Sequence, residues 1–190
     1  MKMKEFTFRA IHVAPLICHN GQTADPLNEF AKKLKVVSGK RKKTDADYET
    51  MAKIEFFAGL YMGKKGPCLP GEMIEAALVN AGKLKRIGKD VIRAVWCNDN
   101  PVLEYEGPRD PEAMYKDGRF TFKAGVRVQR NRVVRTRPRF DEWACNVTIL
   151  YDEETLNLDA VKELVKLAGE SIGFGDWRPK FGRFSVEFKK

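Results

Sequence analysis

Arginines dominate the stretch of this chain whose residue types and spacing best suit binding chemistry. Six of them recur at intervals of two or three residues, and no acidic residue lies between Gly125 and Phe140. They are Arg127, Arg130, Arg132, Arg135, Arg137 and Arg139. Alternate residues of an extended chain share one side, so Arg135, Arg137 and Arg139 would lie together at a spacing comparable to that of successive phosphates. The run predicts contact with a nucleic-acid backbone; the alternative is a solvated arm without a ligand.

A second basic cluster lies nearer the N-terminus and joins two expected helices. It consists of Lys40, Arg41, Lys42 and Lys43, directly after Ser38-Gly39. We interpret it as a flexible connection that contributes to the same nucleic-acid contact. A basic loop that is merely solvated is the alternative.

The segment 173–184 near the C-terminus combines three glycines, three cations and several aromatic rings. Glycine allows a backbone to approach a ligand closely, arginine and lysine bind phosphate oxygens, and aromatic faces stack on bases. The residues expected to contact nucleic acid here are Gly175, Trp177, Arg178, Lys180, Gly182 and Arg183. The alternative is a tight turn between a helix and the last strand, in which Trp177 and Phe181 hold the loop together.

Catalytic patterns have less support in the sequence. His12 and His19 are the only histidines, and His19, in a polar loop with Asp25, is the better candidate for acid–base cleavage of RNA. The acidic residues near position 45 fit a helix start better than a metal site. No P-loop or dinucleotide-binding glycine pattern is present, so the sequence implies neither a metal nor a cofactor.

Composition describes an ordinary globular protein with a basic balance. The 190 residues include 35 lysines and arginines against 26 acidic residues, a net charge of +9, which favours an acidic polymer as partner. No apolar run approaches the 18 residues of a membrane span. The four cysteines are far apart and are expected to be small buried hydrophobes in a reducing cytoplasm.

Hydrophobic patterns predict an α+β fold. Alternation over residues 6–13 and 184–188 predicts strands, and further strands are expected at 56–62, 91–97, 126–130 and 142–151. Apolar residues at spacings of three and four predict helices near 73–84 and 158–168. Strands separated by helices, with both helices on one face, indicate a ferredoxin-like, RRM-like antiparallel sheet. We expect a single domain over 1–190, with a loop-rich insertion at about 98–125 and a basic arm at about 127–140.

Two of these elements together carry a resemblance to a known family. Leu69-Pro70-Gly71-Glu72-Met73 is a Pro-Gly turn that opens a helix, and the other element is the glycine-containing segment 173–184. The pair resembles the RAMP superfamily of ferredoxin-like CRISPR-associated proteins, and most closely the backbone subunits of CRISPR effector complexes. The shortness of the chain favours a compact relative from a phage or mobile element. The resemblance implies binding along a guide RNA, self-assembly, or association with CRISPR effector subunits.

Taken together, the sequence favours a non-enzymatic, cytoplasmic protein that binds single-stranded nucleic acid, RNA before DNA. Two alternatives from other classes remain open. One is a RAMP-type, metal-independent RNA endonuclease that uses His19. The other is a protein-interaction module that mimics or joins a CRISPR effector complex.

Overall fold

The contacts of this chain group into two compact units. The computed structural model describes residues 2–128 and 131–188. The first unit comprises residues 1–16, 62–106 and 140–190, and the second comprises residues 17–61 and 107–139. In chain order, the second unit is therefore built from two insertions into the first. This grouping differs from the single domain with local arms that the sequence suggested.

The first unit contains a four-stranded antiparallel sheet with the strand order β5-β8-β1-β9. Its strands are β1 (Met3–His12), β5 (Val95–Trp96), β8 (Ala144–Asp152) and β9 (Phe184–Phe188). Helix α3 (Gly71–Leu84) lies between β1 and β5 in the chain, and α6 (Leu158–Leu167) lies between β8 and β9. This order of strands and helices is the ferredoxin-like arrangement, so the predicted fold class is confirmed.

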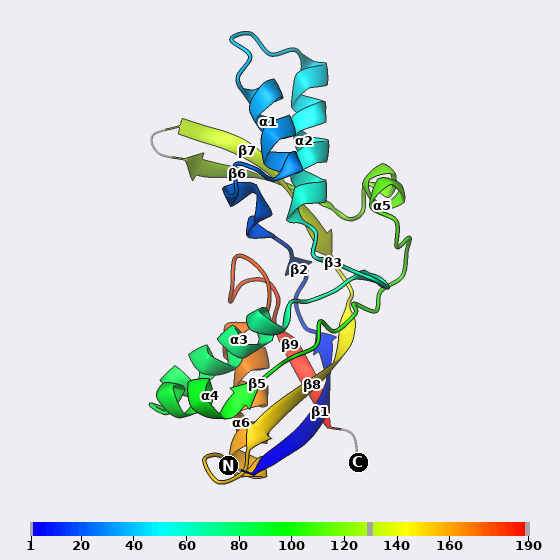
Figure 1. Cartoon of the computed structure of the whole chain (residues 1–190). Helices are drawn as coiled ribbons and strands as arrows, with labels where there is room; N and C mark the ends of the chain where they lie inside the picture. The colour runs from blue at the N-terminus through cyan, green and yellow to red at the C-terminus, as the bar shows by residue number, and fades with distance from the viewer. Residues whose placement is uncertain (1, 129–130, 189–190) are drawn as a thin grey trace. The chain divides into compact units, whose positions relative to one another are not determined.

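Helices α3, α6 and the short α4 (Gly88–Ala94) lie on one face of this sheet (Figure 1). The alternation in β1 explains which face they cover. Phe6, Phe8 and Ala10 are buried, whereas Thr7 and Arg9 on the other face are partly exposed. The core between sheet and helices is completed by buried apolar residues of the neighbouring elements, among them Ile74, Ala77, Val147, Ile149, Leu164 and Val165.

The second unit combines a helical hairpin with a twisted sheet. Helices α1 (Glu29–Ser38) and α2 (Asp45–Gly59) pack together, and β6 (Thr121–Val128) pairs with β7 (Asn131–Phe140) in an antiparallel hairpin. The short strand β2 (Leu16–Ile17) lies on the other side of β7. Helix α5 (Pro111–Asp117) packs on α2, where the Tyr115 and Phe56 ring centroids are 5.3 Å apart.

Several predicted elements are wrong in type. Residues 56–59 end helix α2, and the strand that follows is Met62–Gly63 (β3), which pairs with Gly66–Pro67 (β4). Most of the strand predicted at 91–97 is helix α4. In both places a short apolar run fits a buried helix as well as a strand.

The arm and the insertion also differ from the predictions. Residues 131–140 of the expected basic arm form strand β7, which pairs with β6. The loop-rich region 98–125 contains α5 and the start of β6. Asp110 caps α5 by accepting a hydrogen bond from the Ala113 N–H, and Pro111 occupies the first helical turn.

Four further observations concern the cysteines, the lengths of the helices, and the two ends of helix α6. All four cysteines are free and buried, as predicted. Among the described residues, no helix has the length and apolarity needed to cross a bilayer. Asn157 caps helix α6, since its side chain accepts a hydrogen bond from the Ala160 N–H. A short π-helical turn, Ala168–Ile172, follows α6 and leads into the terminal glycine loop.

Candidate nucleic-acid interface

The net positive charge of the chain lies entirely within the second unit. Residues 17–61 and 107–139 contain 18 lysines and arginines and 9 acidic residues, a net charge of +9. The remaining residues contain 17 of each and are neutral overall. Long-range attraction of a polyanion would therefore act mainly on the second unit.

Two exposed arginines face each other across the β6–β7 hairpin. Arg127 and Arg132 are register partners, and paired residues of an antiparallel ladder lie on the same face. Like charges placed directly opposite destabilise a hairpin unless an anion neutralises them. Neither guanidinium forms a salt bridge within the part of the chain that the structure describes. Arg130, predicted to join them, lies outside the described residues.

Arg135, Arg137 and Arg139 occupy alternate positions of β7, so the prediction that they share one side is confirmed. All three are half-buried. Arg135 pairs with Glu55 of α2, whose carboxylate also accepts the Thr136 N–H at 2.8 Å. The Arg139 guanidinium lies 5.8 Å from the centroid of the Phe122 ring. The contacts of Glu55 attach the hairpin to α2, whereas the contact of Arg139 with Phe122 lies within the hairpin.

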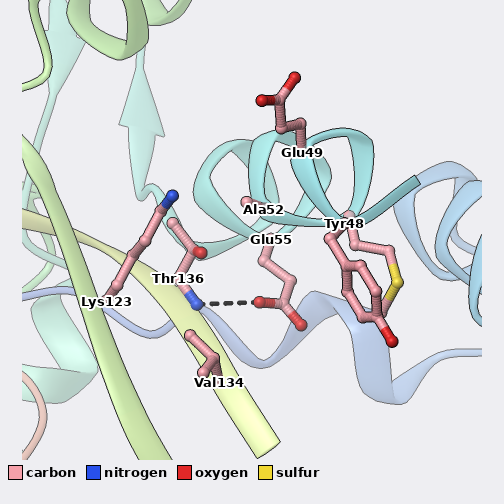
Figure 2. Close-up of a pocket in the computed structure, with 8 residues that line it drawn as sticks. Tyr48, Glu49, Ala52, Glu55, Lys123, Val134 and Thr136 are labelled. Atoms are coloured by element: carbon pink, nitrogen blue, oxygen red, sulfur yellow. Dashed lines mark hydrogen bonds between the residues drawn. The ribbon is translucent and has the colours of Figure 1, made fainter. Parts of the chain in front are cut away.

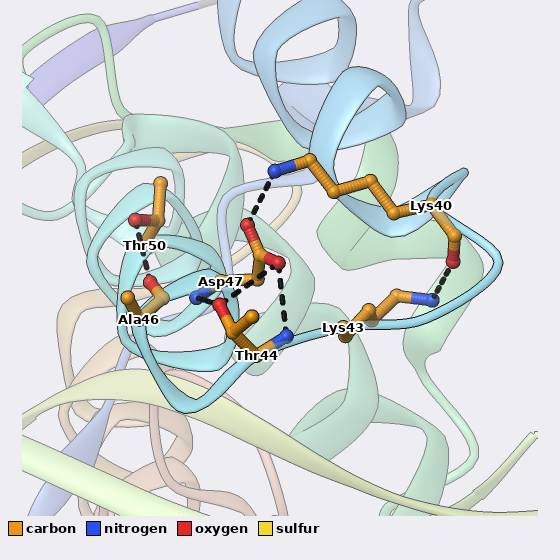
Figure 3. Close-up of polar contacts among 6 residues, drawn as sticks. All are labelled: Lys40, Lys43, Thr44, Ala46, Asp47 and Thr50. Carbon is orange, nitrogen blue, oxygen red and sulfur yellow. Dashed lines mark hydrogen bonds and ion pairs between the residues drawn. The ribbon is translucent and has the colours of Figure 1, made fainter.

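The basic loop between α1 and α2 is folded by two of its own lysines (Figure 3). Lys40 Nζ lies 2.6 Å from an Asp47 carboxylate oxygen, and Lys43 Nζ donates to the Lys40 carbonyl at 2.9 Å. Asp47 also accepts from the Thr44 N–H, and the Thr44 side chain accepts from the Asp47 N–H, so the two residues form a capping box at the start of α2. The ion pair and the backbone hydrogen bond lower the pKa of Asp47 to about 2.

The other two residues of that loop, Arg41 and Lys42, are exposed. Within the described residues, neither side chain takes part in a salt bridge or a hydrogen bond. The predicted basic cluster thus divides into two cations that fix the loop and two that are available to a ligand.

The terminal glycine loop closes on its own backbone. The Phe174 N–H donates to the Gly182 carbonyl at 2.9 Å, and the Gly182 N–H donates to the Pro15 carbonyl at 2.8 Å. Gly182 has φ +76°, and a Cβ there would lie 1.7 Å from the Phe174 carbonyl oxygen. The close approach that glycine allows at position 182 is therefore made to the chain itself, whereas the sequence suggested a ligand.

The other predicted residues of this loop differ in their surroundings. The Gly175 N–H points to the Met73 sulfur at 3.1 Å, and Lys180 Nζ lies 5.6 Å from the centroid of the Phe181 ring. Arg183 has an exposed side chain. Trp177 and the exposed Arg178 border a hollow of about 480 Å³. Contact of Trp177 and Arg178 with nucleic acid stays a prediction.

The sheet face opposite the helices is polar and internally bonded at its centre. The Thr7 and Thr148 hydroxyls lie 2.9 Å apart, and Arg9 binds both carboxylate oxygens of Glu104 at 3.0 and 2.6 Å. Asn146 donates to the same carboxylate at 2.8 Å. RNA-binding sheets of the RRM type stack bases on aromatic side chains. The central strands β1 and β8 place polar side chains at these positions.

The candidate catalytic histidines, His12 and His19, belong to different units. His19 is exposed, and its carbonyl accepts the Tyr61 hydroxyl at 2.8 Å. His12 belongs to the other unit, where its Nδ1 lies 3.2 Å from the Trp143 carbonyl oxygen. The described residues contain no group of three potential metal ligands. Burial raises the pKa of Cys97 to about 11 and that of Cys145 to about 12, so these thiols are protonated at neutral pH.

A pocket between α2 and the β6–β7 hairpin was not found by sequence reasoning (Figure 2). It has a volume of about 290 Å³ and is lined by Tyr48, Glu49, Met51, Ala52, Glu55, Lys123, Val134 and Thr136. Its two walls come from segments about 80 residues apart in the chain. The exposure of its apolar side chains Tyr48 and Val134 is visible only in the structure, so the sequence offered no local signal for this pocket.

Comparisons with known proteins leave the family open. No protein-family model matches the chain, and no curated protein is similar to it. Among solved structures, the chain is similar to the crystal structure of Cmr6 from Pyrococcus furiosus. The alignment covers 100% of both chains at 12% identity, with a TM-score of 0.34. Similarity at this level does not assign the chain to a family.

Proposed function

We propose that this protein binds single-stranded nucleic acid, with RNA as the preferred ligand, and that it does so without chemical turnover. The observation that carries the proposal is the confinement of the +9 net charge to the second unit. Neutralising phosphates with lysine and arginine supplies most of the affinity in such complexes. The facing pair Arg127 and Arg132 adds a local reason, because a phosphate between them would relieve their repulsion.

A single strand fits this surface better than a duplex. Same-side residues of a strand lie about 7 Å apart, which suits an extended sugar–phosphate backbone that follows the hairpin. The basic loop between α1 and α2 adds Arg41 and Lys42 in the same unit. Unpaired bases also leave their faces available to side chains, as in most sequence-tolerant RNA binders.

The cellular setting that we propose rests on the resemblance to the RAMP superfamily. In that setting the ligand is a guide RNA, and the partners are further copies of this chain or subunits of a CRISPR effector complex. The ferredoxin-like first unit would then serve as the scaffold. The inserted second unit would contact the RNA.

The test is a binding isotherm of the full-length protein with labelled 12-nucleotide RNA, DNA of the same sequence, and the corresponding RNA duplex. We expect the single-stranded RNA to bind most tightly and to remain intact during incubation with Mg²⁺ or EDTA. Cleavage that is lost in His19→Ala would replace this proposal with the endonuclease. Failure to bind any of the three, together with capture of effector subunits from which RNA has been removed, would replace it with the protein-interaction module.

A further inference from the structure

The pocket between α2 and the β6–β7 hairpin has two apolar side chains that are not needed to close the core. Tyr48 is 58% exposed and Val134 is 66% exposed, although both line the pocket. The Tyr48 hydroxyl has no hydrogen-bond partner within residues 2–128 and 131–188. A tyrosine with an open ring face and an unused hydroxyl is available to a ligand.

Cations continue along the same face of the hairpin. Lys123 is paired with Thr136, Gly125 with Val134, and Arg127 with Arg132. Because paired residues share a face and alternate pairs repeat on it, Lys123, Val134 and the two arginines follow one another along the pocket side. Lys123 is exposed and forms no salt bridge in the described part of the chain.

The two carboxylates near the pocket would not repel an anion bound on the side of the cationic hairpin face. Arg135 neutralises Glu55. The Glu55 carboxylate also accepts a hydrogen bond from the Thr136 N–H, which holds it against β7 (Figure 2). Figure 2 shows the Glu49 carboxylate turned away from Tyr48 and Val134. The pocket thus joins an aromatic and aliphatic wall to a cationic hairpin face.

We propose that this pocket seats one unpaired nucleobase of the bound strand, stacked on the Tyr48 ring, while Lys123, Arg127 and Arg132 contact the flanking phosphates. The inference rests on the proposed function and adds to it the place where a base is held. The volume of about 290 Å³ lies at the small end for ligand pockets, which suits one base rather than a base pair. Charge complementarity favours a nucleic acid over an apolar protein segment.

The test distinguishes binding of the base from binding of the phosphates by comparing two ligands of equal charge. One is a 12-nucleotide oligoadenylate RNA, and the other is the same ribose–phosphate chain without bases. The wild-type protein should bind the oligoadenylate about 5- to 100-fold more tightly, the range that stacking one base provides. Tyr48→Ala should remove most of this preference, whereas Tyr48→Phe, which keeps the ring, should retain it.

Two valines provide a charge-matched control. Val134 lines the pocket, and Val36 on α1 is similarly exposed at 72% in the same unit. Val134→Glu and Val36→Glu change the net charge equally, but only the first should abolish the preference for bases. Circular dichroism and a thermal melt confirm that each variant is folded.

The outcomes distinguish this inference from the proposed function. If the wild-type protein binds neither oligomer, the proposed function fails and the inference fails with it. If it binds both equally, or if Tyr48→Ala keeps the preference for bases, the proposed function stands and the base pocket is rejected.

Discussion

At the scale of single residues, the described glycines show at which positions the fold requires glycine. Gly182 combines φ +76° with a backbone oxygen 1.7 Å from where a Cβ would lie. Gly118, which ends α5, has φ +77° but nothing within 4 Å of that point. Gly125 in β6 has neither restriction. Substitutions at these three positions therefore distinguish the cost of a left-handed backbone from the cost of a steric clash at the added Cβ.

We therefore expect a graded response to alanine. Gly125→Ala should change the free energy of unfolding by less than about 0.5 kcal/mol, because nothing opposes the added methyl. Gly118→Ala should cost about 1–2 kcal/mol, the usual penalty for a non-glycine residue in the left-handed region. Gly182→Ala should cost clearly more than Gly118→Ala, since the loop closure must also open. Urea unfolding measures all three, and equal losses at positions 118 and 182 would contradict the proposed role of Gly182 in closing the loop.

At the scale of elements, helix α2 allows a direct comparison of two threonines, one at its N-cap and one in its interior. Thr44 caps α2 by accepting the Asp47 N–H, whereas the Thr50 hydroxyl donates to the Ala46 carbonyl inside the helix (Figure 3). Removing a cap leaves a backbone donor unsatisfied. Removing an internal hydroxyl bond leaves the helix ladder intact and improves helix propensity.

Thr44→Ala should therefore lower the free energy of unfolding by about 1 kcal/mol. Thr50→Ala should be neutral or slightly stabilising. Chemical denaturation of the two variants under identical conditions makes the measurement. An equal loss from both would show that the Thr44 cap contributes nothing specific to the loop.

The Lys40–Asp47 pair makes the same connection sensitive to acid. The pKa of Asp47 is lowered in the folded protein from its usual 3.8 to about 2, first of all by Lys40. A depressed carboxyl pKa adds stability above the unfolded value and loses it as the pH falls through the folded value. The stability difference between the wild type and Lys40→Met should thus be present at pH 5 and shrink between about pH 4 and 2. A difference that stays constant to pH 2 would mean that Lys40 acts through packing.

The sequence predicted elements well where periodicity and caps agree. Helix α6 and strand β8 lie close to their expected bounds, and α3 follows its spacing of apolar residues at three and four. Prediction from the sequence failed where tertiary contacts decide between helix and strand. Residues 56–59 are apolar in succession and look extended, but ring packing of Phe56 and Phe57 on Tyr115 keeps them in α2.

At the scale of the whole molecule, the ferredoxin-like order was predictable and the second unit was not. The ferredoxin-like order follows from local patterns taken in chain order. The second requires that residues 17–61 meet residues 107–139, for example through Glu55 and Arg135, and no local pattern signals such a pairing. The pocket between α2 and the β6–β7 hairpin was missed for the same reason, because Tyr48 and Val134 come from those two segments.

The central claim is that the cations of the second unit hold a single-stranded nucleic acid, and charge-matched variants test it most directly. Arg127 and Arg132 can be changed together to Gln and compared with Lys64→Gln and Lys65→Gln, two exposed cations of the neutral first unit. Both double variants lose the same net charge. The measurement is the slope of log K against log salt concentration for a 12-nucleotide single-stranded RNA.

Each phosphate neutralised on a single strand contributes about 0.7 to that slope, so the arginine pair should reduce its magnitude by about 1.4. The lysine pair should leave the slope close to that of the wild type, because the unit to which it belongs carries no net charge and is not proposed to bind the RNA. Equal reductions in the two variants would show that only overall charge attracts the RNA. An unchanged slope in a folded Arg127/Arg132 variant would contradict the account.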